Sequence, residues 1–166
     1  MHYTGTIWRP PYEASSLLLE VTAGCTHHKC KFCTLYHDLP FQFRMSPLKD
    51  IESDLQEVQL WCTDPVAMLA AQLQGMPGPE RIRRTFLVGA NPFVLTYERL
   101  MTIAGQIHQY IPSVQTIGCF ARITDITRKS DEELAALHKT GYDGLTIGIE
   151  TADDEALRFM NKGYAS

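Results

Sequence analysis

The chain of 166 residues is 45% hydrophobic and 20% charged, a composition typical of a globular domain with a substantial core and not of a disordered segment. Its formal net charge of −4 gives no overall basic surface, which argues against a dedicated nucleic-acid binder. No apolar run approaches the roughly 20 residues of a membrane span, and the opening residues lack the pattern of a secretion signal. Five cysteines, three of them crowded together, indicate a reduced, cytoplasmic protein rather than a disulfide framework.

Residues 1–15 are interpreted as an N-terminal arm that precedes a core of residues 16–166. The arm concentrates large and rigid side chains between Trp8 and Glu13. A segment of this kind either covers the floor of the fold or serves as a lid that contacts substrate.

Four short apolar segments are predicted to be β-strands, and each is followed by a segment with helical spacing of apolar residues or with helix-capping signals. The predicted strands are residues 16–22, 85–88, 114–120 and 144–150. The predicted helices after them are residues 47–58, 97–111, 130–141 and 153–163. Residues 62–84 are predicted to form a short helix and a surface loop around the breaker Gly75-Met-Pro-Gly-Pro79.

Successive strand–helix units predict an α/β fold with a parallel sheet and helices outside it. Right-handed crossovers place the carboxyl ends of all strands at one edge of such a sheet. The polar and cysteine-bearing segments follow these ends, at residues 25–33, 89–91, 120–122 and 150. We therefore expect them to converge on one face, where barrel and open α/β enzymes keep their chemistry.

The strongest chemical signal is the segment Cys25-Thr-His-His-Lys-Cys30-Lys-Phe-Cys33. Three thiolates on one short loop suit a soft metal centre and are one fewer than the four ligands of a closed zinc site or an all-cysteine iron–sulfur cluster. A zinc site completed by His27, His28 or His37 is the structural alternative. With three ligands only, a coordination position stays open for a substrate or cofactor.

The three cysteines make the chain resemble the radical S-adenosylmethionine (SAM) superfamily. The resemblance implies that Cys25, Cys30 and Cys33 hold three irons of a 4Fe-4S cluster and that SAM chelates the fourth iron. Phe32 matches the aromatic position that packs near the adenine in this family. The commonest family pattern has three residues between the first two cysteines, whereas this chain has four, Thr26 to Lys29.

Further matches to the family follow the later strands. Gly89-Ala90-Asn91 takes the place of the Gly-Gly-Glu segment that holds the methionine amino group, and Asn91 offers an amide oxygen in place of a carboxylate. Glu150 resembles a polar position near the ribose or methionine moiety, and Arg122 is expected to face the SAM carboxylate. The alternative is structural: Gly89-Ala90-Asn91 is also a good turn sequence, and Glu150 and Arg122 are also typical exposed charges at strand ends.

The resemblance implies a partial (β/α) barrel and reductive cleavage of SAM to a 5′-deoxyadenosyl radical, with a flavodoxin or ferredoxin as the type of electron donor. The substrate, small or macromolecular, is not encoded in any motif. The family's barrel usually has six strand–helix units and this sequence shows four, so we expect a truncated chain. A catalytically silent fragment is therefore the second alternative.

Overall fold

The computed structural model describes residues 1–75 and 82–166. Of the surface loop predicted around Gly75, residues 76–81 lie outside the described part of the chain. In the described part, no helix combines the length and the apolar character needed to cross a membrane.

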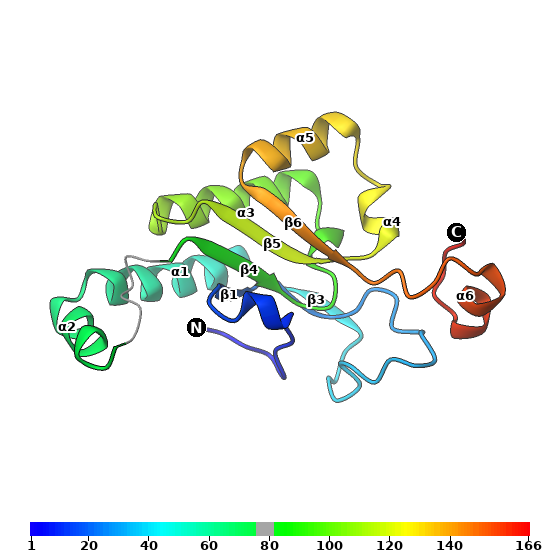
Figure 1. Ribbon diagram of the computed structural model, residues 1–166, viewed down its shortest axis with the longest axis horizontal. Coiled ribbons are helices and arrows are strands. Elements are labelled where there is room, and N and C mark those ends of the chain that lie inside the picture. The colour runs from blue at the N-terminus through cyan, green and yellow to red at the C-terminus, as the bar shows by residue number, and fades with distance from the viewer. Residues whose placement is uncertain (76–81) are drawn as a thin grey trace.

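A four-stranded parallel sheet forms the centre of the molecule (Figure 1). Its strands are, in spatial order, β1 (Leu17–Glu20), β4 (Arg84–Val88), β5 (Thr116–Ala121) and β6 (Tyr142–Ile147). Helices alternate with these strands along the chain, as a partial (β/α) barrel requires. The fold class predicted from the sequence is thereby confirmed.

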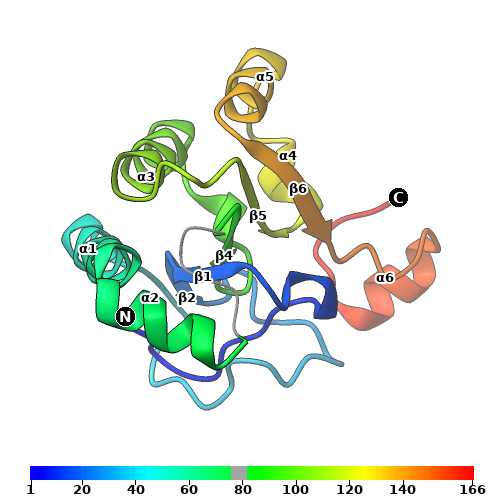
Figure 2. The same ribbon diagram turned by 60° about the vertical axis from the view of Figure 1, so that its left-hand side comes forward.

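The main helices lie outside the sheet, where α1, α3 and α5 follow one another along its outer face (Figure 2). The six α-helices of the described chain are α1 (Leu48–Thr63), α2 (Pro65–Leu73), α3 (Tyr97–Tyr110), α4 (Ile123–Ile126), α5 (Asp131–Lys139) and α6 (Asp154–Met160). Two short 3-10 helices, η1 (Pro11–Glu13) and η3 (Pro92–Val94), complete the helical elements of those residues. The capping box predicted at the start of α5 is present, with Ser130 and Glu133 exchanging hydrogen bonds.

The first predicted strand is wrong in its extent. The chain leaves the sheet after β1 and forms β2 (Thr22–Gly24), which pairs in an antiparallel ladder with β3 (Phe43–Met45). At the break, Val21 still hydrogen-bonds the sheet through Val88 and accepts from Ser46. The β2–β3 ribbon thus carries the chain from the sheet edge to the cysteine segment.

The outer face of the sheet packs against the helices through apolar side chains. Leu87 of β4 and Ile117 and Cys119 of β5 are fully buried there. On the helix side, α3 buries residues at positions i, i+3, i+4 and i+7, namely Leu100, Ile103, Ala104 and Ile107. This layer is the hydrophobic core of the chain.

The inner face begins, at the amino ends of the strands, with a charged floor. Arg84 makes a forked contact with Glu13 of the N-terminal arm, with Nε–Oε2 and Nη2–Oε1 distances of 2.9 Å, and it also pairs with Asp143. Gly118 and Gly144 leave room for the guanidinium, since a Cβ there would lie 2.5 and 2.9 Å from Nη2. The N-terminal arm therefore covers the floor of the fold, which is one of the two roles predicted for it; the other was a lid that contacts substrate.

Candidate functional site

The cysteine segment follows β2 and forms a loop of residues 25–33, here called the cluster loop. It begins after Gly24, which has a positive φ of 77°. Glycine is required there because a Cβ at this position would lie 2.2 Å from Gln42 O. The Cys25 amide donates to Gln42 O at 2.9 Å, and the Cys33 amide donates to Cys30 O at 3.2 Å. All three cysteines are half-buried thiols.

A cavity of about 250 Å³ opens at the carboxyl ends of the strands, where the cluster loop meets the sheet. It is lined by residues from five parts of the chain: the arm, the cluster loop with the residues after it, and the segments after β4, β5 and β6. Among the lining residues are Cys25, Cys30, Phe32, Cys33, Gly89, Ala90, Arg122 and Glu150. Eight of the nine residues that the family resemblance assigns to the cluster or to SAM thus surround one cavity; the ninth is Asn91.

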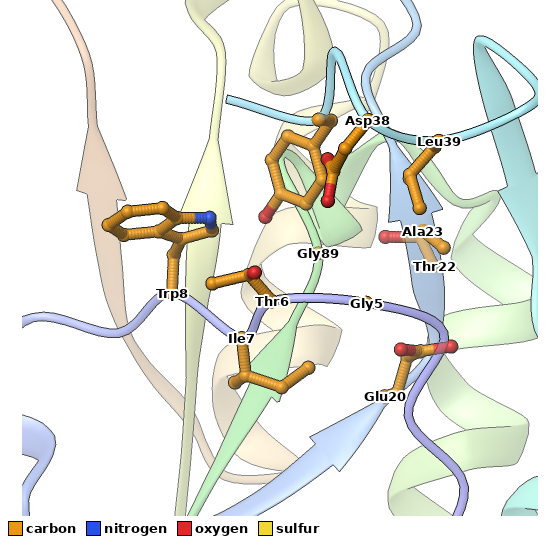
Figure 3. Close-up of a pocket in the computed structure, with 11 residues that line it drawn as sticks. Gly5, Thr6, Ile7, Trp8, Glu20, Thr22, Ala23, Asp38, Leu39 and Gly89 are labelled. Carbon is orange, nitrogen blue, oxygen red and sulfur yellow. The ribbon is translucent and has the colours of Figure 1, made fainter. Parts of the chain in front are cut away.

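The N-terminal arm also reaches this end of the sheet. Figure 3 shows residues Gly5 to Trp8 passing beside Gly89 and the β2 residues Thr22 and Ala23. The pocket between them, about 10 Å³, holds no more than a water molecule. Because Trp8 lines the larger cavity as well, the arm runs from the cavity to the floor at Glu13 and contacts both.

Charges around the cavity act on the thiols. Burial raises the pKa of the Cys30 thiol, while the cations of Lys162 and Arg122 oppose this rise and the neighbouring Cys25 and Cys33 add to it. The three sulfur atoms therefore lie within electrostatic reach of one another and of two positive charges. Because burial is the larger effect, the pKa of Cys30 stays above its ordinary value despite the two cations.

Lys162 is the main site residue that the sequence analysis did not single out. Its side chain is only 7% exposed, and its ammonium lies 3.1 Å from Glu150 Oε1 and 5.5 Å from the centre of the Phe32 ring. Glu150 itself has a positive φ of 67°. The available signal was an Asn-Lys-Gly sequence directly after a helix, which resembles an ordinary helix end.

Asn91 does not line the cavity, although its neighbours Gly89 and Ala90 do. Its side chain is fully buried, and its Nδ2 donates to Thr26 Oγ1 at 2.9 Å and to Asp125 Oδ2 at 3.0 Å. Its Oδ1 has no hydrogen-bond partner in the described part of the chain. A buried acceptor without a partner is costly unless a ligand or water completes it.

The histidines near the cysteines contact the protein itself. His27 Nε2 lies 2.6 Å from Asn161 O, His37 Nε2 lies 2.8 Å from Cys33 O, and the rings of His28 and His37 meet edge to face at 4.7 Å. Within residues 1–75 and 82–166, no three His, Cys, Asp or Glu side chains are arranged to hold a metal ion.

Comparison with known protein families agrees with the cysteine pattern and the parallel sheet. The family model of the radical SAM superfamily matches residues 19–166, and the chain therefore belongs to the radical SAM superfamily. Searches among curated proteins and among solved structures gave no match. The matched range begins within β1 and contains the other three strands of the parallel sheet and the cluster loop.

Proposed function

We propose that the chain binds a 4Fe-4S cluster through Cys25, Cys30 and Cys33 and binds SAM in the adjoining cavity. The observation that carries the proposal is that three thiols from one nine-residue loop line the same cavity as the segments after three parallel strands. The donor set fits the cluster, since soft thiolate ligands are those that iron–sulfur clusters use. When bound, the cluster supplies the electron that cleaves SAM into methionine and a 5′-deoxyadenosyl radical.

The cavity walls offer a matching group for each part of SAM. The Phe32 ring, half exposed beside the cysteines, provides a flat apolar surface for the adenine. Arg122 offers a cation for the carboxylate, and Glu150 offers a carboxylate for the ribose hydroxyls or the amino group. Both charged side chains reach the cavity from segments directly after parallel strands.

The backbone after β4 provides the remaining contact. Gly89 and Ala90 line the cavity without bulky side chains, so a ligand can approach the main chain closely. The adjacent Asn91 is fully buried, but its Oδ1 is an acceptor without a partner among the described residues, and we propose that it accepts from the methionine amino group when SAM binding exposes it. In this role Asn91 would hold the amino group and the cluster loop together, because its Nδ2 already donates to Thr26.

We further propose that a reduced flavodoxin or ferredoxin delivers the electron and that the chain works in the reducing cytoplasm, where such clusters and thiols persist. The radical then abstracts a hydrogen atom from the substrate.

The test is anaerobic reconstitution of the purified chain with iron and sulfide, followed by addition of SAM and dithionite. We expect close to four irons per chain, a broad brown absorbance that dithionite bleaches, and formation of 5′-deoxyadenosine. Tight zinc binding without iron would support the structural zinc site instead. A cluster that never cleaves SAM would support the silent fragment.

Two single-cysteine variants sharpen this test. Cys30→Ala should lose the cluster while keeping most secondary structure, because its thiol is one of only three cysteine ligands. Cys62→Ala is the matched control, since Cys62 lies in α1 and does not line the cavity. Unchanged iron content in Cys30→Ala would remove Cys30 from the ligand set.

A further inference from the structure

The turn that ends α6, residues 160–162, lies against the cluster loop. Three successive carbonyl oxygens of this α6 turn accept hydrogen bonds from outside the helix. Met160 O accepts from the Lys31 amide at 3.0 Å, and Lys162 O accepts from the Arg122 guanidinium at 2.6 Å. Between them, Asn161 O meets His27 Nε2 at 2.6 Å.

The conformation of Asn161 produces this arrangement. Asn161 adopts the left-handed region, with φ 57° and ψ 47°, as the C-cap of α6. The Asn161 and Lys162 amides donate back to Arg158 O and Leu157 O, so the turn satisfies its own N–H groups within α6. Its carbonyls are left to point outward, and the Asn161 side chain adds a donor, since Nδ2 donates to Lys29 O at 3.0 Å.

The middle of the cluster loop, residues 27–31, depends on the α6 turn for its hydrogen bonds to the rest of the protein. Among residues 1–75 and 82–166, the hydrogen bonds that residues 27–31 make outside the loop all go to the α6 turn. The amino end of the loop is held separately, at Cys25 by Gln42 and at Thr26 by Asn91. Its carboxyl end is held at Cys33 O by His37 Nε2. Gly163 lets the His27 ring approach, because a Cβ there would lie 2.8 Å from Cε1.

We propose that the α6 turn is a clamp that fixes the shape of the cluster loop, with Asn161 as its positioning residue. The clamp acts on the four-residue interval between Cys25 and Cys30, which is where this chain departs from the commonest cysteine spacing. A longer interval has more conformations, so its ligands need an external hold to stay preorganised. That the loop binds an iron–sulfur cluster rests on the proposed function, but the hydrogen bonds that form the clamp do not depend on it.

The test compares thiol accessibility in the metal-free full-length chain. Asn161→Gly tolerates the left-handed backbone conformation and removes the side-chain hydrogen bond to Lys29 O. We expect the alkylation rates of Cys30 and its two partner cysteines to rise by about fivefold, the effect of one lost hydrogen bond on local opening. Cys62 and Cys119, on α1 and β5, should react at unchanged rates.

Two further variants separate the clamp from general stability. His27→Ala removes the second contact from the loop side, and with Asn161→Gly it should give a non-additive effect in a double-mutant cycle. Asp154→Asn changes α6 at its other end, where the carboxylate accepts a hydrogen bond from the Ser166 amide at 2.8 Å, and should leave all five rates unchanged. Unchanged loop rates in Asn161→Gly, or a rise at all five cysteines together, would overturn the clamp.

A spectroscopic readout completes the test. After reconstitution, the reduced cluster of Asn161→Gly should give a broadened electron paramagnetic resonance signal, because its ligands sample more than one arrangement. A signal identical to that of the unaltered chain would contradict the proposal. If the unaltered chain takes up no cluster, the proposed function fails, while the alkylation rates still decide whether the clamp exists.

Discussion

The two faces of the parallel sheet differ in what they bury. The outer face is closed by helices and contains apolar side chains such as Leu87, Ile117 and Cys119. The inner face has an ion pair at its floor, the rings of Phe86 and Phe120 in edge contact at 5.2 Å in its middle, and the cysteine-lined cavity at its top. The outer face supplies most of the stability, and the inner face is free to carry polar groups and chemistry.

The largest stability effect on the inner face should come from Arg84→Met. The variant leaves Glu13 charged with a side chain that is 1% exposed, and unpaired buried charges cost several kcal/mol. Because Arg84 is itself 29% exposed, we expect a loss near the lower end, about 3 kcal/mol in urea unfolding. The neighbouring exposed Arg83→Met is the control and should change stability by less than about 0.5 kcal/mol.

The same ion pair predicts a pH dependence. Burial alone would raise the pKa of Glu13, but hydrogen bonds from Arg84 and Ser16 and the charge of Arg84 together lower it below its ordinary 4.5. A lowered folded-state pKa gives stability that is present at neutral pH and is lost as pH falls below about 4.5. Stability measured between pH 7 and pH 3 should therefore fall less in Arg84→Met; equal slopes would contradict this.

A pair of glycine variants compares the two faces directly. Gly118→Ala on the inner face would place a Cβ 2.5 Å from Arg84 Nη2 and 3.1 Å from the Phe86 ring, and should cost about 1–3 kcal/mol. Gly105→Ala on the exposed side of α3 meets nothing within 4 Å and should add up to about 1 kcal/mol through helix propensity. Thermal melts of the two variants should shift in opposite directions. A stabilised Gly118→Ala would show that the floor is less tightly packed than described.

A further predicted effect concerns ligand binding at the top of the inner face. Asn91→Ala removes the partnerless Oδ1 and should weaken SAM binding by about tenfold, the effect of one hydrogen bond to a charged group. Thr26→Val removes the partner of Nδ2 but leaves Oδ1 in place, and should change the affinity less. Isothermal titration with the reconstituted chain measures both. Equal losses in the two variants would mean that Asn91 acts only by holding the cluster loop.

The sequence predicted the sheet and the convergence of strand ends because these follow from local patterns. Continuous apolar strands and helical spacing in α3 reflect burial that each element carries in its own residues. Because the strands are parallel, the segments that follow them meet at one edge of the sheet, so the shared location of Cys25, Arg122 and Glu150 could be predicted without tertiary contacts.

Other features depend on contacts between distant segments and have no local pattern. The β2–β3 ribbon joins two three-residue strands that are too short to show a period. Lys162 is buried because Glu150 and the Phe32 ring surround it, and both come from other parts of the chain. Asn91 likewise ended a plausible turn in the sequence, and only Thr26 and Asp125 show that it is a buried bridge.

The most direct test of the central claim is the electron paramagnetic resonance spectrum of the reconstituted, dithionite-reduced chain before and after addition of SAM. If Cys25, Cys30 and Cys33 leave one iron open to the cavity, the reduced cluster should give a signal whose g values change when SAM binds. A preparation that takes up no iron, or a cluster signal that SAM leaves unchanged, would contradict the account.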